Sequence, residues 1–233
     1  MSEPLATLLV PALLSTPRLY ADQLPHLWRF GPVTVADHTR DDSVSAIAKR
    51  ILADAPSRFA LVGLSMGGYT ALEILRQAPG RVIKLALLDT SARPDAPEQS
   101  EGRRAMMALA RSGRFGEIAD MMYPRLVDKS RHNDAALKQI VRTMAQEIGP
   151  EAFVRQQSAI MNRPDSRATL TSIRCPTLVL VGESDALTPP ELASELAAGI
   201  SASRLVKVPG SGHLSSLEQP AAVTRALVEL LQS

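Results

Sequence analysis

The sequence predicts an α/β protein in which a mostly parallel sheet of about six strands is flanked by helices and carries a helical lid. Two observations favour this class. Short apolar runs alternate with amphipathic helical patterns near both ends of the chain, and an all-helical stretch interrupts them in the middle. The 233 residues are 45% hydrophobic, which suits one substantial core.

The first part of the chain contains four expected strands. They are residues 5–10, 32–36, 59–62 and 82–88. A short helical region at residues 20–28 follows the first strand, and Trp28 is expected in the core. A helix from Val44 with Asp42 or Ser43 as its cap, and a helix from Gly67 to about residue 78, complete the alternation.

The rhythm changes in the middle of the chain and then returns. Between residues 95 and 172 strand-like runs vanish, and apolar residues such as Leu137, Val141 and Met144 recur at helical spacing. Two further strands at 176–181 and 204–208 are then expected, with helices beginning at Pro190 and near Pro220. We therefore expect a core of residues 1–94 and 173–233, with residues 95–172 inserted as a helical cap.

Composition excludes several classes of partner. Lys plus Arg number 26 against 24 Asp plus Glu, a net charge of +2 that is too balanced for nucleic acid or an anionic membrane surface. The single cysteine, Cys175, cannot form an internal disulfide, which fits a reducing compartment. With no signal-peptide pattern and no membrane-spanning apolar run, we expect a cytoplasmic protein acting on a small molecule. Its oligomeric state carries no sequence signal.

Residues 59–70 carry the feature around which the chain is organised. Gly63-Leu64-Ser65-Met66-Gly67 is a G-x-S-x-G turn between a buried strand and a helix. Such a turn holds its central residue in a strained conformation, with the side chain exposed at the carboxyl end of the strand. Ser65 is therefore a candidate nucleophile beside a helix N-terminus that can bind an anion.

Two later strand ends supply the groups that a serine nucleophile needs. Asp185 follows the strand at 176–181, and His213 follows the strand at 204–208. Because the carboxyl ends of parallel strands meet at one edge, these side chains are expected beside Ser65. We expect His213 to accept the proton of Ser65 and Asp185 to orient the imidazole.

Other polar residues have weaker claims. Asp89 follows the strand at 82–88 and is an alternative acid. His26, His38 and His132 show no metal-ligand spacing and are expected at the surface or in packing. There is no dinucleotide fingerprint or phosphate loop, so no cofactor and no metal are expected.

The expected cap is rich in methionine. Its six methionines are Met106, Met107, Met121, Met122, Met144 and Met161. Methionine fills irregular apolar space, so these residues either line an acyl pocket or pack the cap helices on each other. The residues expected to contact substrate are Leu14, Met121, Met122 and Tyr123.

Together these pieces resemble the α/β-hydrolase superfamily along nearly the whole chain. The resemblance rests on the G-x-S-x-G turn continued by Gly68, the segment 173–185 that ends in Gly-Glu-Ser-Asp, and Gly210-Ser211-Gly212-His213. Within the superfamily the chain is similar to small capped esterases and lactonases, such as the enol-lactonase and acyl-carrier methyl-ester carboxylesterase groups. The resemblance implies a minimal version of that fold, because the chain begins on what matches the family's third strand.

The resemblance also implies an oxyanion hole made of backbone N–H groups. By position the donors are Leu13 and Met66. The family usually carries His-Gly in the loop after its third strand, whereas this chain has Pro11-Ala12. Because Ala12 stands where relatives have a glycine, the resemblance does not fix the backbone path of that loop or the place of Leu13.

These observations predict a serine hydrolase that cleaves a small carboxylic ester, thioester or lactone through an acyl-enzyme. One alternative keeps the same three residues for cofactor-free perhydrolase, carbon–carbon hydrolase or lyase chemistry. Another is a non-catalytic ligand-binding protein with the same fold.

Overall fold

The computed structural model describes residues 4–233, which form a six-stranded sheet with every neighbouring pair parallel. The strand order is β2-β1-β3-β4-β5-β6. The strands are β1 (Thr7–Val10), β2 (Val33–Val35), β3 (Phe59–Leu64), β4 (Val82–Leu88), β5 (Thr177–Gly182) and β6 (Ser203–Val208). This architecture confirms the predicted fold class.

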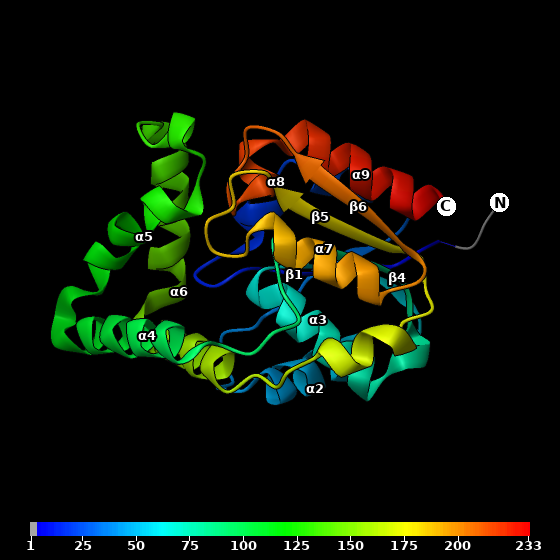
Figure 1. Cartoon of the computed structure of the whole chain (residues 1–233), viewed down its shortest axis with the longest axis horizontal. Helices are drawn as coiled ribbons and strands as arrows, with labels where there is room; N and C mark the ends of the chain where they lie inside the picture. The colour runs from blue at the N-terminus through cyan, green and yellow to red at the C-terminus, as the bar shows by residue number, and fades with distance from the viewer. Residues whose placement is uncertain (1–3) are drawn as a thin grey trace.

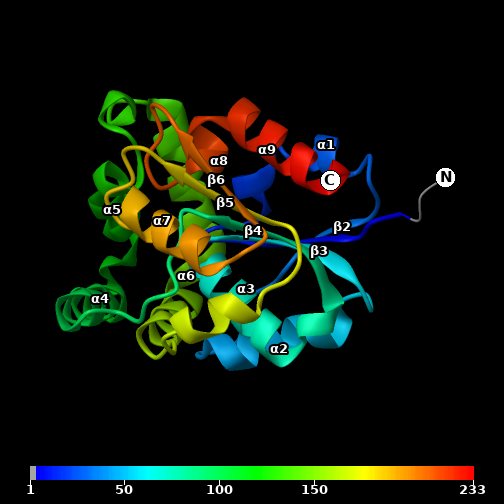
Figure 2. The same ribbon diagram turned by 45° about the vertical axis from the view of Figure 1, so that its right-hand side comes forward.

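Helices cover both faces of the sheet (Figure 1 and Figure 2). The helices are α1 (Leu24–Leu27), α2 (Val44–Asp54), α3 (Met66–Gln77), α4 (Pro97–Leu109), α5 (Ile118–Leu126), α6 (Ala135–Met161), α7 (Pro190–Gly199), α8 (Ser215–Glu218) and α9 (Pro220–Gln232). Buried side chains of α2, α3 and α7 share one apolar cluster, whereas those of α1 and α9 belong to the cluster on the opposite face. The sheet is thus sealed on both sides.

The central strand explains why the core forms around the serine turn. All six residues of β3 are buried, as expected for a parallel strand covered on both faces.

α9 buries Val223, Leu227 and Leu230 against the sheet, and burying each such side chain contributes about 1.5–3 kcal/mol. Ser43 caps α2 by accepting a hydrogen bond from the Ala46 N–H at 3.2 Å.

Residues 95–172 form only helices, turns and loops, which we call the helical segment. In Figure 1 it lies beside the edge of the sheet toward which the strand arrows point. α6 changes direction at Gly149, where φ is +78°, and Pro150 follows at the break. A second glycine with positive φ, Gly113 at +83°, follows α4. Helices are therefore joined in this segment by residues that tolerate left-handed backbone.

Three local expectations are corrected. The helical region expected at 20–28 is a 3-10 turn at Pro17–Tyr20 followed by the single turn α1. Trp28 is 64% exposed, because α1 ends before it and Leu27 makes the core contact instead. The short helix α8 was not expected, since its sequence, Ser-Ser-Leu-Glu, has no apolar periodicity.

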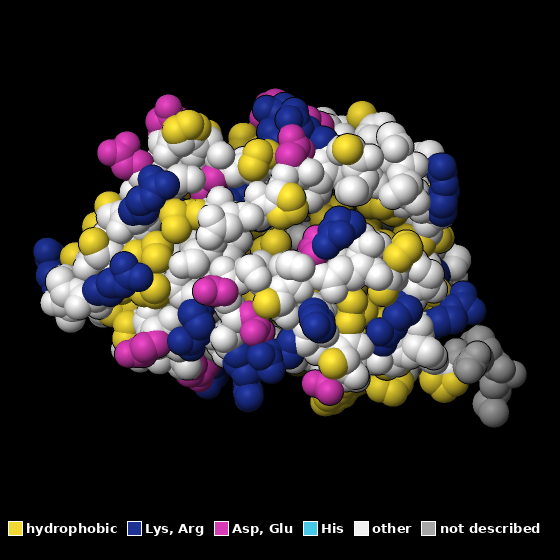
Figure 3. Space-filling model, turned by 90° about the horizontal axis from the view of Figure 1, so that it is seen from below, with side chains coloured by type: hydrophobic (Ala, Val, Ile, Leu, Met, Phe, Trp, Pro, Cys, Tyr) yellow, Lys and Arg dark blue, Asp and Glu magenta, His cyan; other side chains and the backbone are white. Residues whose placement is uncertain are grey.

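The charges on the surface are mixed. On the face shown in Figure 3, basic and acidic side chains are interspersed. No helix among residues 4–233 has the length and apolar character needed to cross a membrane.

Candidate active site

Ser65 lies at the apex of the turn between β3 and α3 and adopts φ +55°. A left-handed backbone at a non-glycine residue costs on the order of 1–3 kcal/mol and persists only where its surroundings hold it. Here the Ser65 N–H donates to Leu88 O at 2.9 Å, and Thr90 Oγ1 donates to Ser65 O at 2.8 Å. A Cβ on Gly67 would lie 1.9 Å from Val10 O, so only glycine fits there.

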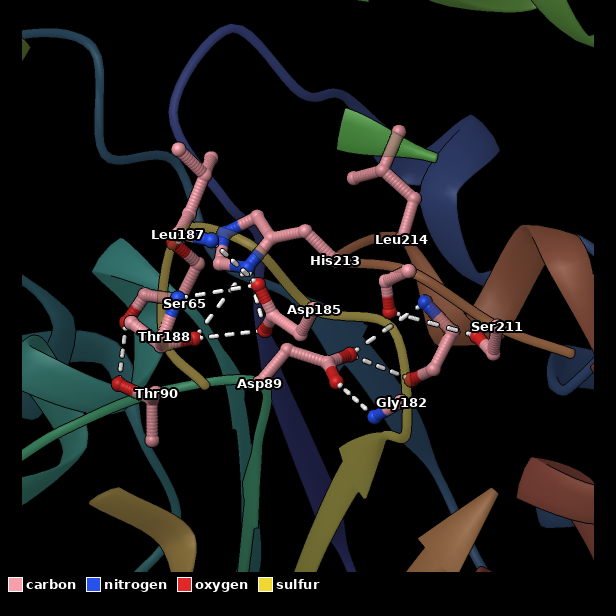
Figure 4. A network of polar contacts seen from close by, with 12 residues as sticks. Ser65, Asp89, Thr90, Gly182, Asp185, Leu187, Thr188, Ser211, His213 and Leu214 are labelled. Atoms are coloured by element: carbon pink, nitrogen blue, oxygen red, sulfur yellow. Dashed lines mark hydrogen bonds and ion pairs between the residues drawn. The ribbon is translucent and has the colours of Figure 1, made fainter. Parts of the chain in front are cut away.

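The structure brings Ser65, His213 and Asp185 into one hydrogen-bonded chain (Figure 4). Ser65 Oγ lies 2.8 Å from His213 Nε2. His213 Nδ1 lies 2.8 Å from Asp185 Oδ2. The three side chains come from loops after β3, β5 and β6, as the sequence predicts. The serine hydroxyl can pass its proton to the imidazole in this geometry.

The Asp185 carboxylate is fixed by its own loop. Its Oδ1 accepts the N–H groups of Leu187 at 2.8 Å and Thr188 at 3.0 Å. Its Oδ2 accepts the Thr188 hydroxyl at 2.7 Å in addition to His213 Nδ1–H. With both oxygens held, the carboxylate sets which imidazole nitrogen carries hydrogen. Thr188 was missed at the sequence level, although it lies only three residues after the predicted acid.

The electrostatics favour an ionised acid beside a basic imidazole. Burial opposes ionisation of Asp185, but the His213 charge and the hydrogen bonds from His213 and Thr188 outweigh it and lower the pKa of Asp185. Burial likewise opposes protonation of His213, but Asp185 outweighs it and raises the pKa of His213 above its usual 6.5. The pair thus stabilises an imidazolium.

Asp89, the alternative acid, makes no hydrogen bond to Ser65, His213 or Asp185. Its Oδ1 accepts the Gly182 N–H at 2.9 Å, and its Oδ2 accepts the Ser215 hydroxyl (Figure 4). Burial, reinforced by the nearby negative charge of Asp185, raises the pKa of Asp89 to about 8. Asp89 therefore links the two loops that carry Asp185 and His213, while Asp185 makes the contact to the imidazole.

Comparison with known proteins identifies the family of this chain. Residues 6–226 match the model of the alpha/beta hydrolase family. The chain belongs to this family. It is an enzyme of the alpha/beta hydrolase fold.

Several alpha/beta hydrolases illustrate the similarity. The chain is 29% identical over 221 residues to a pimeloyl-[acyl-carrier protein] methyl ester esterase of Neisseria meningitidis serogroup B, covering 89% of this chain and 85% of that protein. A thermophilic esterase from Thermogutta terrifontis superimposes with a TM-score of 0.87 at 33% identity, over 98% of this chain and 89% of that one. The enol-lactonase from Burkholderia xenovorans LB400 shares the fold, with a TM-score of 0.89 at 24% identity over 100% and 93% of the two chains.

The two expected oxyanion donors belong to two different elements next to the cavity of Ser65. Met66 is the first residue of α3, where helix N–H groups lack intrahelical partners. Leu13 lies in the loop after β1 and lines the same cavity as Ser65. Neither the Leu13 nor the Met66 N–H has a hydrogen-bond partner within residues 4–233. Both donors are therefore free to bind a developing oxyanion.

A cavity of about 690 Å³ extends from Ser65 and His213 under the helical segment. Of the four residues expected to contact substrate, Leu14 and Met122 line it. Met121 does not, since it is 51% exposed at the surface, and Tyr123 is buried with its hydroxyl donating to Arg131 O at 2.9 Å. Three consecutive residues of a helix point in different directions, so only one of them can face the cavity.

The rest of the cavity wall combines methionines with one polar cluster. Met106 and Met144 join Met122, which supports an apolar lining. Asp95, whose side chain is 1% exposed, pairs with Arg103 at 2.7 Å and with Arg163. Both arginines line the cavity, and their guanidinium groups share the carboxylate of Asp95.

A buried glutamate that was not expected holds the loop of His213. Glu218, in α8, accepts the Gly212 N–H at 2.9 Å and the Asp128 N–H at 2.7 Å. Leu126 O in turn accepts the N–H groups of His213 and Leu214 at 3.0 and 3.1 Å. Residues 126–128 of the helical segment are therefore tied directly to the loop that carries the imidazole. Glu218 follows His213 by only five residues, but nothing in the local sequence indicates that its carboxylate turns back.

Metal binding has no support in the described part of the chain. Among residues 4–233 there is no group of three or more His, Cys, Asp or Glu side chains that could hold a metal ion.

Proposed function

We propose that this alpha/beta hydrolase cleaves a small carboxylic ester, thioester or lactone through an acyl-enzyme formed on Ser65. The observation that carries the proposal is the chain of two 2.8 Å contacts from Ser65 through His213 to Asp185, which opens into the cavity. A serine hydroxyl needs such a base, and the base needs an orienting group.

The reaction follows from the contacts. Ser65 Oγ attacks the substrate carbonyl while His213 Nε2 accepts its proton, and Asp185 stabilises the imidazolium that forms. The carbonyl oxygen becomes negatively charged between the N–H groups of Leu13 and Met66. His213 then delivers the proton to the leaving oxygen or sulfur, and an activated water reverses the sequence to release the acid.

The helical segment serves as the cap in this proposal. It supplies Met106, Met122 and Met144 to the cavity, and these flexible apolar side chains suit an acyl chain of modest size. Arg103 and Arg163 make the other wall cationic, so an acyl group with a terminal carboxylate belongs in any substrate panel.

A panel of activated esters graded by acyl length, with several lactones, tests the proposal on the wild type and on Ser65→Ala. Removal of a serine nucleophile lowers kcat by about 10⁶-fold in comparable enzymes. A fluorophosphonate probe should label the wild type at Ser65. Ser194→Ala, a change in α7 away from the cavity, is the matched control and should keep full activity.

Two results would redirect the proposal. Ester cleavage by Ser65→Ala at wild-type rates would refute nucleophilic catalysis by Ser65, and failure of the probe to label the wild type would point to a ligand-binding protein. Peracid formation measured beside ester cleavage separates hydrolase from perhydrolase chemistry.

A further inference from the structure

The loop that carries Leu13 is strained. Leu14 adopts φ +57°, and the Ser15 N–H donates to Ala12 O at 3.2 Å, which closes a tight turn over Leu13. Glycine usually occupies a position with this φ, and a leucine there costs roughly 1–2 kcal/mol. Neither Pro11 nor Ala12 has a polar side chain that could fix the turn. Within the turn, Ser15 Oγ donates to Leu13 O at 3.3 Å, and further restraint comes from other parts of the chain.

Two buried polar side chains supply it. His38, in the loop after β2 and 2% exposed, places Nε2 2.9 Å from Ala12 O. Gln156, in α6 and fully buried, places Oε1 3.1 Å from the Leu14 N–H. The turn is thus held by two side chains that lie beside each other, although they are 118 positions apart in the sequence.

The chemistry fixes the direction of each bond. His38 Nε2 is nearer to Ala12 O, at 2.9 Å, than to the Gln156 amide nitrogen, at 3.3 Å, so we assign its hydrogen to the shorter contact, in which Nε2–H donates to Ala12 O. Burial lowers the pKa of His38, so the ring is neutral and this is its single N–H. In this tautomer the Gln156 amide nitrogen, 3.3 Å from the same Nε2, faces a second donor and makes no hydrogen bond to it. Gln156 Oε1 accepts from Leu14, as an amide oxygen can.

The bond to Ala12 O acts directly on the expected oxyanion donor. Ala12 C=O and Leu13 N–H are opposite ends of one planar peptide unit, so fixing the carbonyl fixes the direction of the N–H. A hydrogen bond to the carbonyl also polarises the unit and strengthens the N–H as a donor.

We propose that His38 is a positioning residue for the oxyanion hole, that it aims the Leu13 N–H through the Ala12 peptide, and that Gln156 fixes the adjoining peptide at Leu14. This rests on the proposed acyl transfer at Ser65. It gives His38 a role beyond the surface or packing role that the sequence led us to expect.

Steady-state kinetics on His38→Ala and Gln156→Met test the proposal. Loss of a whole oxyanion donor costs about 10²–10³-fold in kcat, and a misaimed one should cost less. We expect kcat to fall about 10- to 100-fold for His38→Ala and about 10-fold for Gln156→Met, with KM within about threefold of wild type. Affinity for a trifluoromethyl ketone, whose adduct places an oxyanion in the hole, should fall in parallel with kcat.

Two further variants separate positioning from packing. His38→Gln retains an N–H that can reach Ala12 O and should recover most of kcat, which a purely structural role for the ring would not predict. Ile47→Val removes a buried methyl group from α2 and should lower the melting temperature without changing kcat.

The outcomes are distinguishable from those of the proposed function. Activity that survives in Ser65→Ala overturns acyl transfer at Ser65, whatever the result at His38. Where Ser65 proves essential, a kcat of His38→Ala within twofold of wild type overturns the positioning role, as does a loss confined to KM. If His38→Ala does not fold, an unchanged kcat and ketone affinity in His38→Gln and Gln156→Met together overturn it.

Discussion

Replacing Asp185 with asparagine isolates the tautomer of His213 from the shape of the site. In the wild type, Oδ1 of Asp185 accepts two backbone N–H groups and Oδ2 accepts His213 Nδ1–H. In the variant, the amide oxygen must take the Oδ1 place, because an NH₂ group there would face the two N–H donors of Leu187 and Thr188. Leaving a buried donor unpaired costs about 1–3 kcal/mol each.

The amide nitrogen of Asp185→Asn then faces His213 Nδ1. Nδ1 of His213 must then accept a hydrogen bond from this amide, so the ring hydrogen moves to Nε2 and points at Ser65 Oγ. An imidazole in this tautomer cannot take the serine proton. The expected loss in kcat is about 10⁴-fold, the scale known for a wrong tautomer in serine hydrolases, which corresponds to roughly 5–6 kcal/mol of barrier.

The assay is kcat and KM with an activated ester, together with the rate of fluorophosphonate labelling. Labelling should slow in step with kcat, because both need the same proton transfer. Asp89→Asn is the comparison variant: Asp89 is a buried acid with no hydrogen bond to His213, so the tautomer is kept, and any loss of kcat from the two loops that it links should be far smaller than 10⁴-fold. An Asp185→Asn variant that folds and retains activity within about tenfold of wild type would refute the tautomer reasoning.

Three further predictions follow from the same geometry. The raised pKa of His213, the base that must be neutral to act, predicts that kcat/KM rises with pH to a plateau above an apparent pKa higher than 6.5; a flat profile from pH 5.5 to 8 would contradict it. Gly67→Ala should lose about 3 kcal/mol or more of unfolding free energy in urea, because its Cβ meets Val10 O, whereas Gly102→Ala, with open space around it, should not be destabilised. Asp89, with its pKa raised to about 8 from the usual 3.8, stabilises the fold when protonated, and this contribution declines with rising pH until it is lost above about 8. The urea stability of Asp89→Asn relative to wild type should therefore grow from pH 5 to pH 8 and then level off.

The fold was predictable because its signals are local. The central strand of the sheet is a continuous apolar run at residues 59–64, and such a run marks a strand buried on both faces. The places of Ser65, Asp185 and His213 were also predictable, because all three lie in loops that follow strands, and parallel strands end at the same edge of the sheet.

The rest depends on contacts between distant segments. Gln156 accepts from Leu14 across 142 positions, and Glu218 reaches Asp128 across 90, so neither partner leaves a trace in its own neighbourhood. The orientations of Met121 and Tyr123 within α5 were not predictable for a similar reason. Which face of α5 meets the cavity is set by the packing of α5 on α6, not by the composition of either.

The bonds from Glu218 and Leu126 to the His213 loop restrict how substrate can enter. A hinge motion that carried residues 126–128 outward would also pull the imidazole away from Ser65. Productive entry must therefore leave this corner fixed and bend the helical segment elsewhere. Gly113 and Gly149 suit that purpose, because both have positive φ and open space around them. A bend at these two glycines would leave the hydrogen bonds between residues 126–128 and the His213 loop intact, and with them the proton-transfer geometry.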